Sequence, residues 1–144
     1  MDRVFLDANV LFSAAWSKKN RLRTLWDQEG IELLTSVYCL EETRCNLLDH
    51  KPAVVTDLEE LPAKLLIVPE ANAEEALPES MVLPVKDVPV FLAAIASQAT
   101  HFLTGDFRHF GSYRGQTHAG ILILAPADYL DTATKPTGKK RKTS

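Results

Sequence analysis

Apolar residues fall into short runs that are separated by longer segments with helical spacing. Each run has four or five mostly apolar residues with β-branched or aromatic members, and polar or turn-forming residues bound it, as is typical of buried strands. Five strands are predicted in this way, at 3–6, 31–35, 65–68, 101–104 and 121–124. Helices are predicted at 21–29, 37–48, 51–61, 88–99 and 125–131. The acidic, proline-containing stretch 70–86 receives no element.

The helix predicted after the second strand has a clear start and a candidate buried face. Ser36 can cap its N-terminus. Val37, Leu40, Leu47 and Leu48 recur at helical spacing, so we expect them to share one face.

The alternation of strands and helices indicates the fold class. Strands that are apolar throughout are buried on both faces, which is typical of a parallel sheet with helices on each side. We therefore predict an α/β fold. The longest unbroken apolar run, Val90–Ala96, is seven residues, far below the roughly 20 that a membrane span needs. Two cysteines and no export signal favour a cytoplasmic, reducing location.

Charge is distributed unevenly along the chain. The net charge is -3, but the last ten residues hold five basic and no acidic side chains, which leaves -8 on the other 134. We predict a folded domain over 1–134 and a disordered basic tail over 135–144. The tail is a candidate RNA-binding element through Lys139, Lys140, Arg141 and Lys142.

Acidic residues follow the predicted strands. Asp7 and Asp106 come directly after the first and fourth strands, Asp87 begins the helix before the fourth, and Glu41 and Glu42 lie on the helix after the second. Ligands of open parallel sheets bind at the carboxyl ends of the strands, where these acids would converge. At about 4 Å each like-charged pair would repel by about 4 kcal/mol, so protons or divalent cations must neutralise the cluster. Oxygen ligands without His or Cys favour Mg²⁺ or Mn²⁺.

Simpler interpretations exist for several of these residues. Asp87 can be a helix cap, Asp106 a turn residue, and the Glu pair a solvated helix face. His109 lies three residues after Asp106 and could face the same crevice, but a surface or half-buried ring is the commoner outcome. The chain has no nucleotide-binding glycine loop, no serine elbow and no zinc-protease motif.

Four segments resemble the PIN domain, and their order and spacing span nearly the whole chain: VFLDANVLFSA at 4–14, LLTSVYCLEETRCNL at 33–47, KDVPVFLAAIASQATHFLTGDFRHF at 86–110 and GILILAPADYL at 120–130. The resemblance implies a three-layer α/β/α sandwich with a mostly parallel sheet of about five strands. It also implies a Mg²⁺- or Mn²⁺-dependent endoribonuclease. In this chain Asp7, Glu42, Asp87 and Asp106 match the family's acids, with Asn9 and Thr104 in support.

The second acid has two candidates. Aligning the motif E-E-T-R-C-N-L favours Glu42, whereas a helical wheel puts Glu41 nearer the Leu40–Leu48 face. We follow the motif. After the fourth strand the chain reads FRHFGSYRG, without the further acids that many members carry, which leaves open whether one metal ion binds or two.

Small one-domain members of this family resemble toxin ribonucleases that pair with an antitoxin protein and form homodimers. RNA, an antitoxin and a second copy of the chain are therefore the expected partners, with no membrane association. The alternative is a catalytically silent PIN-fold scaffold that binds RNA or protein. All four acidic positions are filled, which favours the enzyme.

Overall fold

The computed structural model describes residues 1–17, 19–69 and 77–133. The predicted basic tail, including Lys139, Lys140, Arg141 and Lys142, lies outside these residues, so its order remains a prediction.

The centre of the molecule is a mixed sheet in the order β3-β2-β1-β4-β6-β5. All five predicted strands are present and pair in parallel. Their bounds are β1 Asp2–Leu6, β2 Ile31–Ser36, β3 Leu65–Val68, β4 His101–Leu103 and β6 Ile121–Leu124. The sequence pattern missed β5, Thr117–His118, an antiparallel edge strand too short to carry a periodic signal. A turn with positive φ at Ala119 and Gly120 joins it to β6.

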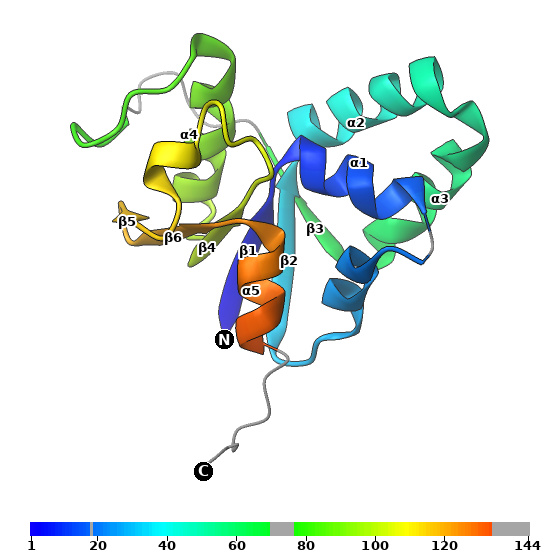
Figure 1. Cartoon of the computed structure of the whole chain (residues 1–144), viewed down its shortest axis with the longest axis horizontal. Coiled ribbons are helices and arrows are strands. Elements are labelled where there is room, and N and C mark those ends of the chain that lie inside the picture. Colours follow the sequence, from blue (N-terminus) through cyan, green and yellow to red (C-terminus); the bar gives the residue numbers. More distant parts are fainter. Residues whose placement is uncertain (18, 70–76, 134–144) are drawn as a thin grey trace.

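Helices cover both faces of the sheet (Figure 1). On one side α1 (Ala8–Trp16), α2 (Val37–His50) and α3 (Val55–Glu60) pack against one another. After β3 the chain reverses direction across the sheet, and because crossovers between parallel strands are right-handed, α4 (Val88–Ala96) covers the opposite face. The closing helix is α5 (Pro126–Ala133). The fold is thus the predicted three-layer α/β/α sandwich. None of the described helices has the length and apolar character needed to cross a membrane.

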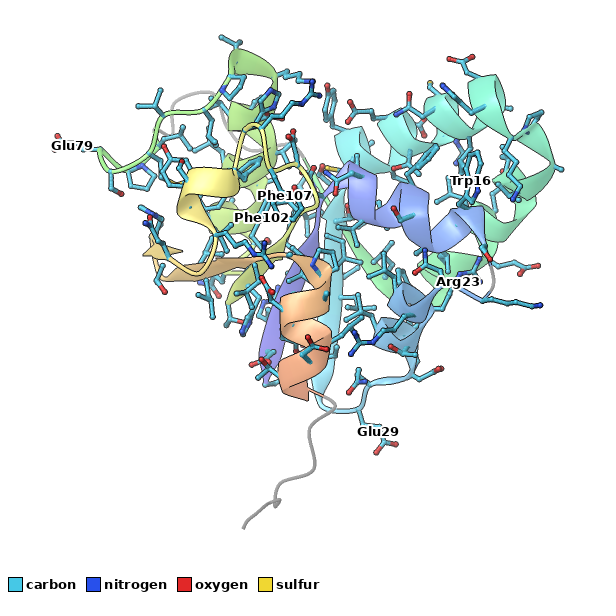
Figure 2. The ribbon with its side chains drawn as sticks, in the orientation of Figure 1. Trp16, Arg23, Glu29, Glu79, Phe102 and Phe107 are labelled. Carbon is cyan, nitrogen blue, oxygen red and sulfur yellow. The ribbon has the colours of Figure 1, made fainter. Side chains whose placement is uncertain are left out.

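Aromatic side chains fill the core between β1, β4 and α4. Phe5 and Phe102 stack with ring centroids 5.6 Å apart, and Phe91 lies edge-on to Phe102 at 5.2 Å. Phe110, from the loop after β4, reaches the same cluster at 5.0 Å from Phe102. Figure 2 labels Phe102 at the centre of this packing. The ends of β1 and β4 and the loop that follows β4 are therefore held on one rigid platform.

Two of the predicted helices differ from expectation. Segment 21–29 forms a 3₁₀ helix, η1 (Arg21–Asp27), and Gly30 with φ 77° follows it as the expected stop. Segment 51–61 is divided into η2 (Pro52–Val54), α3 and the first residue of η3 (Leu61–Lys64). Local spacing of apolar residues signals a helical turn, but it does not distinguish the tighter 3₁₀ turn from the α-helix.

The buried face of α2 is also different from the predicted one. Val37 and Leu48 are 47% and 53% exposed. The buried residues are Cys39, Thr43 and Leu47. The Thr43 hydroxyl lies 3.1 Å from the Ala8 carbonyl oxygen on α1 and 2.8 Å from that of Cys39. Small and polar side chains form this face because α1 packs closely against it. Ser36 caps the helix as predicted, and its hydroxyl accepts a hydrogen bond from Cys39 N.

Candidate functional site

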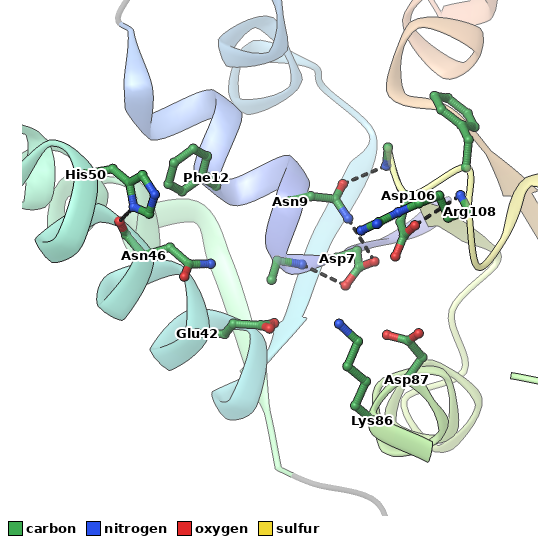
Figure 3. Close-up of a pocket in the computed structure, with 13 residues that line it drawn as sticks. Asp7, Asn9, Phe12, Glu42, Asn46, His50, Lys86, Asp87, Asp106 and Arg108 are labelled. Carbon is green, nitrogen blue, oxygen red and sulfur yellow. Dashed lines mark hydrogen bonds between the residues drawn. The ribbon is translucent and has the colours of Figure 1, made fainter. Parts of the chain in front are cut away.

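A pocket of about 670 Å³ opens at the carboxyl ends of β1 and β4. The crossovers from β1 and to β4 run on opposite faces of the sheet, which leaves a crevice between them. Asp7, Glu42, Asp87 and Asp106 all line this pocket (Figure 3). The structure therefore brings together the four carboxylates predicted from the sequence, from β1, α2, η4 (Val85–Asp87) and the loop after β4.

Asp7 is the deepest of the four acids, and only 7% of its surface is exposed. It follows β1 and caps α1, with Oδ1 accepting a hydrogen bond from Ala8 N at 2.8 Å. Oδ2 accepts hydrogen bonds from Thr104 Oγ1 at 2.9 Å and Asn9 Nδ2 at 3.1 Å. Burial, and to a lesser extent the negative charges of Asp87 and Glu42, raises the pKa of Asp7 to about 6 despite these bonds.

Asn9 and Thr104 join the loops that carry Asp7 and Asp106. Thr104 Oγ1 accepts a hydrogen bond from Asp106 N at 3.0 Å while it donates to Asp7. Asn9 Oδ1 accepts from Gly105 N at 2.6 Å, and a Cβ at position 105 would come within 3.2 Å of that oxygen. Both residues therefore lie where the sequence motifs placed the supporting side chains.

Asp106 combines a turn function with a carboxylate oxygen that contacts His109. Oδ1 accepts hydrogen bonds from Arg108 N and His109 N at 3.2 Å each, as expected of a turn residue. Oδ2 lies 2.9 Å from His109 Nδ1. Asp87 occupies the N-cap position of α4 but makes no capping hydrogen bond. Capping does not explain Asp87, and its carboxylate faces the pocket instead (Figure 3).

His109 is half-buried, as expected, and it also faces the crevice, which was the less favoured of the two outcomes. Its Nδ1 lies 2.7 Å from Asp87 Oδ2 and 2.9 Å from Asp106 Oδ2. These three residues are close enough to hold a metal ion together. The spacing of three after Asp106 was the available signal, because a turn at Asp106 returns position 109 to the same side.

Glu42, and not Glu41, lines the pocket. Glu41 is 58% exposed and lies 3.7 Å from Arg44 on the outer face of α2. The helical wheel was misleading because it used Val37 and Leu48, which face solvent. Once Cys39, Thr43 and Leu47 define the buried face, Glu42 lies at its border with the pocket.

The pocket is also lined by residues that sequence reasoning did not select, among them Lys86, Arg108, Phe12, Asn46 and His50. Lys86 directs its ammonium group into the space between Glu42 and Asp87 (Figure 3). Arg108 lies on the rim beside Asp106, and the opposite wall consists of Phe12, Asn46 and His50. Asn46 and His50 follow Glu42 at the helical spacing of four on α2, which was the available signal. Phe12, Lys86 and Arg108 reach the site only through the packing of α1 against α2, the position of η4 and the turn after β4.

The side chains present fit a divalent cation. Asp87 Oδ2 is buried and has no hydrogen-bond partner among the described residues, so its lone pairs are unsatisfied. Asp7 has a raised pKa because burial and two neighbouring carboxylates disfavour its charge, and a cation would relieve both effects. Carboxylate oxygens from separate segments are the ligands that hard cations prefer.

The fold also occurs in two solved structures. The chain has a TM-score of 0.56 and 15% identity to a chain of VapBC2 from Rickettsia felis, which was solved bound to a promoter DNA fragment, over 85% of this chain and 98% of that one. The chain also resembles VapC20 from Mycobacterium tuberculosis, described as a toxin that cleaves the sarcin-ricin loop. The TM-score is 0.52 and the identity 13%, over 73% of this chain and 92% of that one. No protein-family model and no curated protein matches the chain. The VapC proteins have the PIN fold, and this chain shares it.

Proposed function

We propose that this chain is a metal-dependent endoribonuclease that hydrolyses RNA phosphodiester bonds with Mg²⁺ or Mn²⁺. The observation that carries the proposal is the convergence of Asp7, Glu42, Asp87 and Asp106 on one pocket at the carboxyl end of the sheet. Four acids in one pocket destabilise the metal-free protein, and a binding function alone gives no reason to retain all of them.

The four carboxylates would hold the cation, with Asn9 and Thr104 fixing Asp7 and Asp106 in position. When bound, such an ion neutralises the developing phosphoryl charge and lowers the pKa of water. Lys86 and Arg108 flank the acids and are suited to bind the phosphates of the RNA backbone.

Water is the nucleophile in this proposal. Cys39 is the thiol nearest to the acids, with Sγ 3.9 Å from Asp7 Oδ1, and burial raises its pKa to about 12. It therefore stays protonated and unreactive. Because the ribose 2′-hydroxyl then takes no part, the products should carry a 5′-phosphate and a 3′-hydroxyl.

The shape of the pocket favours a polymeric substrate. Glu42 faces the three aspartates from α2, and beyond it the pocket continues past Phe12, Asn46 and His50 on α1 and α2 (Figure 3). An aromatic ring beside an amide and an imidazole suits a nucleotide base next to the bond that is cleaved. A single-stranded or looped RNA segment matches this layout.

The biological setting belongs to the same proposal. VapBC2 is a complex and VapC20 is described as a toxin, and this chain shares their fold. We propose that it too is the toxin of a toxin–antitoxin pair, with an antitoxin protein as its partner and a cytoplasmic location. A homodimer remains a prediction from the family resemblance.

The test is cleavage of structured and unstructured RNA by the wild type in Mg²⁺, in Mn²⁺ and in EDTA. Asp7→Asn should lower the rate by roughly 100-fold or more, as expected when a group that stabilises transition-state charge is lost. Glu41→Gln, the exposed neighbour of Glu42, is the control that should cleave normally.

Three results would contradict the proposal. Full activity in EDTA or a 2′,3′-cyclic phosphate product would exclude hydrolysis that depends on a metal ion. An absence of cleavage on every RNA by metal-loaded wild type would favour the PIN-fold scaffold that binds without catalysis.

A further inference from the structure

The contacts of His109 with two carboxylates are close but are not hydrogen bonds. Nδ1 lies 2.7 Å from Asp87 Oδ2 and 2.9 Å from Asp106 Oδ2, which are ordinary hydrogen-bond distances. Yet His109 Nδ1 and Asp87 Oδ2 are both buried without a hydrogen-bond partner among the described residues. Because the distances suit a hydrogen bond, the angle at Nδ1 must be the unsuitable feature. Neither oxygen then lies along the line on which Nδ1 carries its proton or lone pair.

This arrangement is what adjacent ligands of one metal ion produce. Ligand atoms at about 2.1 Å from an ion, on neighbouring vertices of an octahedron, lie about 3 Å apart, and each directs its lone pair at the ion and not at its neighbour. The two measured separations are close to this value. One ligand atom from each of Asp87, Asp106 and His109 lies within 4.8 Å of the others.

The local fold holds the imidazole and the carboxylate together. Asp106 Oδ1 accepts the backbone N–H of His109, and Phe110 N donates to the Asp106 carbonyl oxygen at 3.0 Å. Phe110 is 1% exposed and packs against Phe102 in the core. The turn 106–110 is thus anchored on both sides, so the relative position of the two side chains is preorganised.

We propose that His109 Nδ1 is a ligand of the metal ion, beside Asp87 and Asp106, and that it makes the site select Mn²⁺ over Mg²⁺. This inference rests on the proposed metal-dependent function. Mn²⁺ is a transition ion and accepts an imidazole nitrogen, although less strongly than the later ions of the series, whereas Mg²⁺ prefers an all-oxygen shell and keeps its water. The nitrogen therefore adds affinity for Mn²⁺ and little for Mg²⁺.

The first test is pulsed electron paramagnetic resonance of Mn²⁺ bound to the wild type. Nitrogen coupling should be present, should change when histidine is labelled with ¹⁵N, and should be absent in His109→Ala. His118→Ala is the matched control, because His118 lies on the edge strand β5 outside the pocket and hydrogen bonds to Ser80 and Gln116. The labelled wild type shows whether a histidine nitrogen binds the ion even if a variant does not fold, and His50→Ala distinguishes His109 from the other histidine of the pocket.

The second test is the affinity for each ion by calorimetry. The wild type should bind Mn²⁺ at least 10-fold more tightly than Mg²⁺. His109→Ala should lose roughly 10-fold or more of its Mn²⁺ affinity and change its Mg²⁺ affinity less than 3-fold, and His109→Asp should reduce the Mn²⁺ preference by supplying oxygen.

The outcomes separate this inference from the proposed function. Mn²⁺ binding without nitrogen coupling, or tighter Mn²⁺ binding by His109→Ala, would overturn the histidine ligand while leaving metal-dependent cleavage intact. Failure of the wild type to bind either ion, together with cleavage in EDTA, would overturn both.

Discussion

The buried charge of Asp7 should destabilise the metal-free protein, and this can be measured. Its pKa is about 6 in the fold, against 3.8 for an ordinary Asp, mainly because burial disfavours the charged form. The folded state therefore binds the proton more tightly than the unfolded state does. The contribution of Asp7 to stability is therefore most favourable below pH 3.8 and is lost as the pH rises through 6, since the unfolded chain gives up the proton first.

The magnitude follows from the shift. At about 1.4 kcal/mol per pKa unit, charging Asp7 lowers the free energy of unfolding by about 3 kcal/mol at pH 7.5 and by about 0.5 kcal/mol at pH 4. Asp7→Asn removes this charge but replaces an acceptor of hydrogen bonds from Thr104 and Asn9, which costs about 1 kcal/mol at either pH.

Comparing the stability difference between Asp7→Asn and the wild type at the two pH values isolates the effect of the Asp7 charge. In EDTA, urea unfolding should show Asp7→Asn more stable than the wild type by about 2 kcal/mol at pH 7.5 and close to it or slightly less stable at pH 4. The difference in free energy of unfolding between the variant and the wild type should thus change by about 2.5 kcal/mol between the two pH values. Glu41→Gln, at an exposed position, should follow the wild type at both pH values. A gap for Asp7→Asn that stays constant with pH would refute the argument that burial makes this charge unfavourable.

The remaining predictions test other features. Glu42→Gln should lower RNA cleavage by roughly 100-fold, with Glu41→Gln within 2-fold of wild type, and equal effects in a rate assay would remove the distinction between the two. At pH 8 a maleimide should label the exposed Cys45 and not Cys39, because burial raises the pKa of Cys39 to about 12. Mass spectrometry of the labelled native protein measures this, and rapid labelling of Cys39 would contradict its burial. Truncation after Thr134 should weaken RNA binding and flatten its salt dependence without changing the cleavage sites; unchanged binding across a salt series would exclude the basic tail.

The parts of the fold that local sequence encodes were predictable. The five parallel strands were found because each is a run of mostly apolar residues in a sheet that helices cover on both faces, although Leu66 on the edge strand β3 is 48% exposed. Asp7 and Asp106 were found because each directly follows such a strand, and the carboxyl ends of parallel strands share an edge. Ser36 was identified as a cap because that interaction spans three residues of one chain segment.

Other features depended on contacts that no local pattern records. The face of α2 is set by its packing on α1, where Thr43 and Cys39 are buried and Val37 is not, and this packing brings Glu42 to the pocket in place of Glu41. The strand β5 exists only because β6 offers it an edge.

The sequence alone determined which residue types are available for chemistry. It also determined at which edge of the sheet Asp7 and Asp106 meet, because strand burial follows from the local hydrophobic pattern and strand direction from chain order. Only the tertiary structure decided which side chains complete the site. His109 reaches Asp87, 22 positions away in the chain, because the turn after β4 is anchored by Phe110 in the core and α4 begins beside it. Such a contact is fixed by the packing of distant segments against one another, which leaves no periodic trace in the sequence.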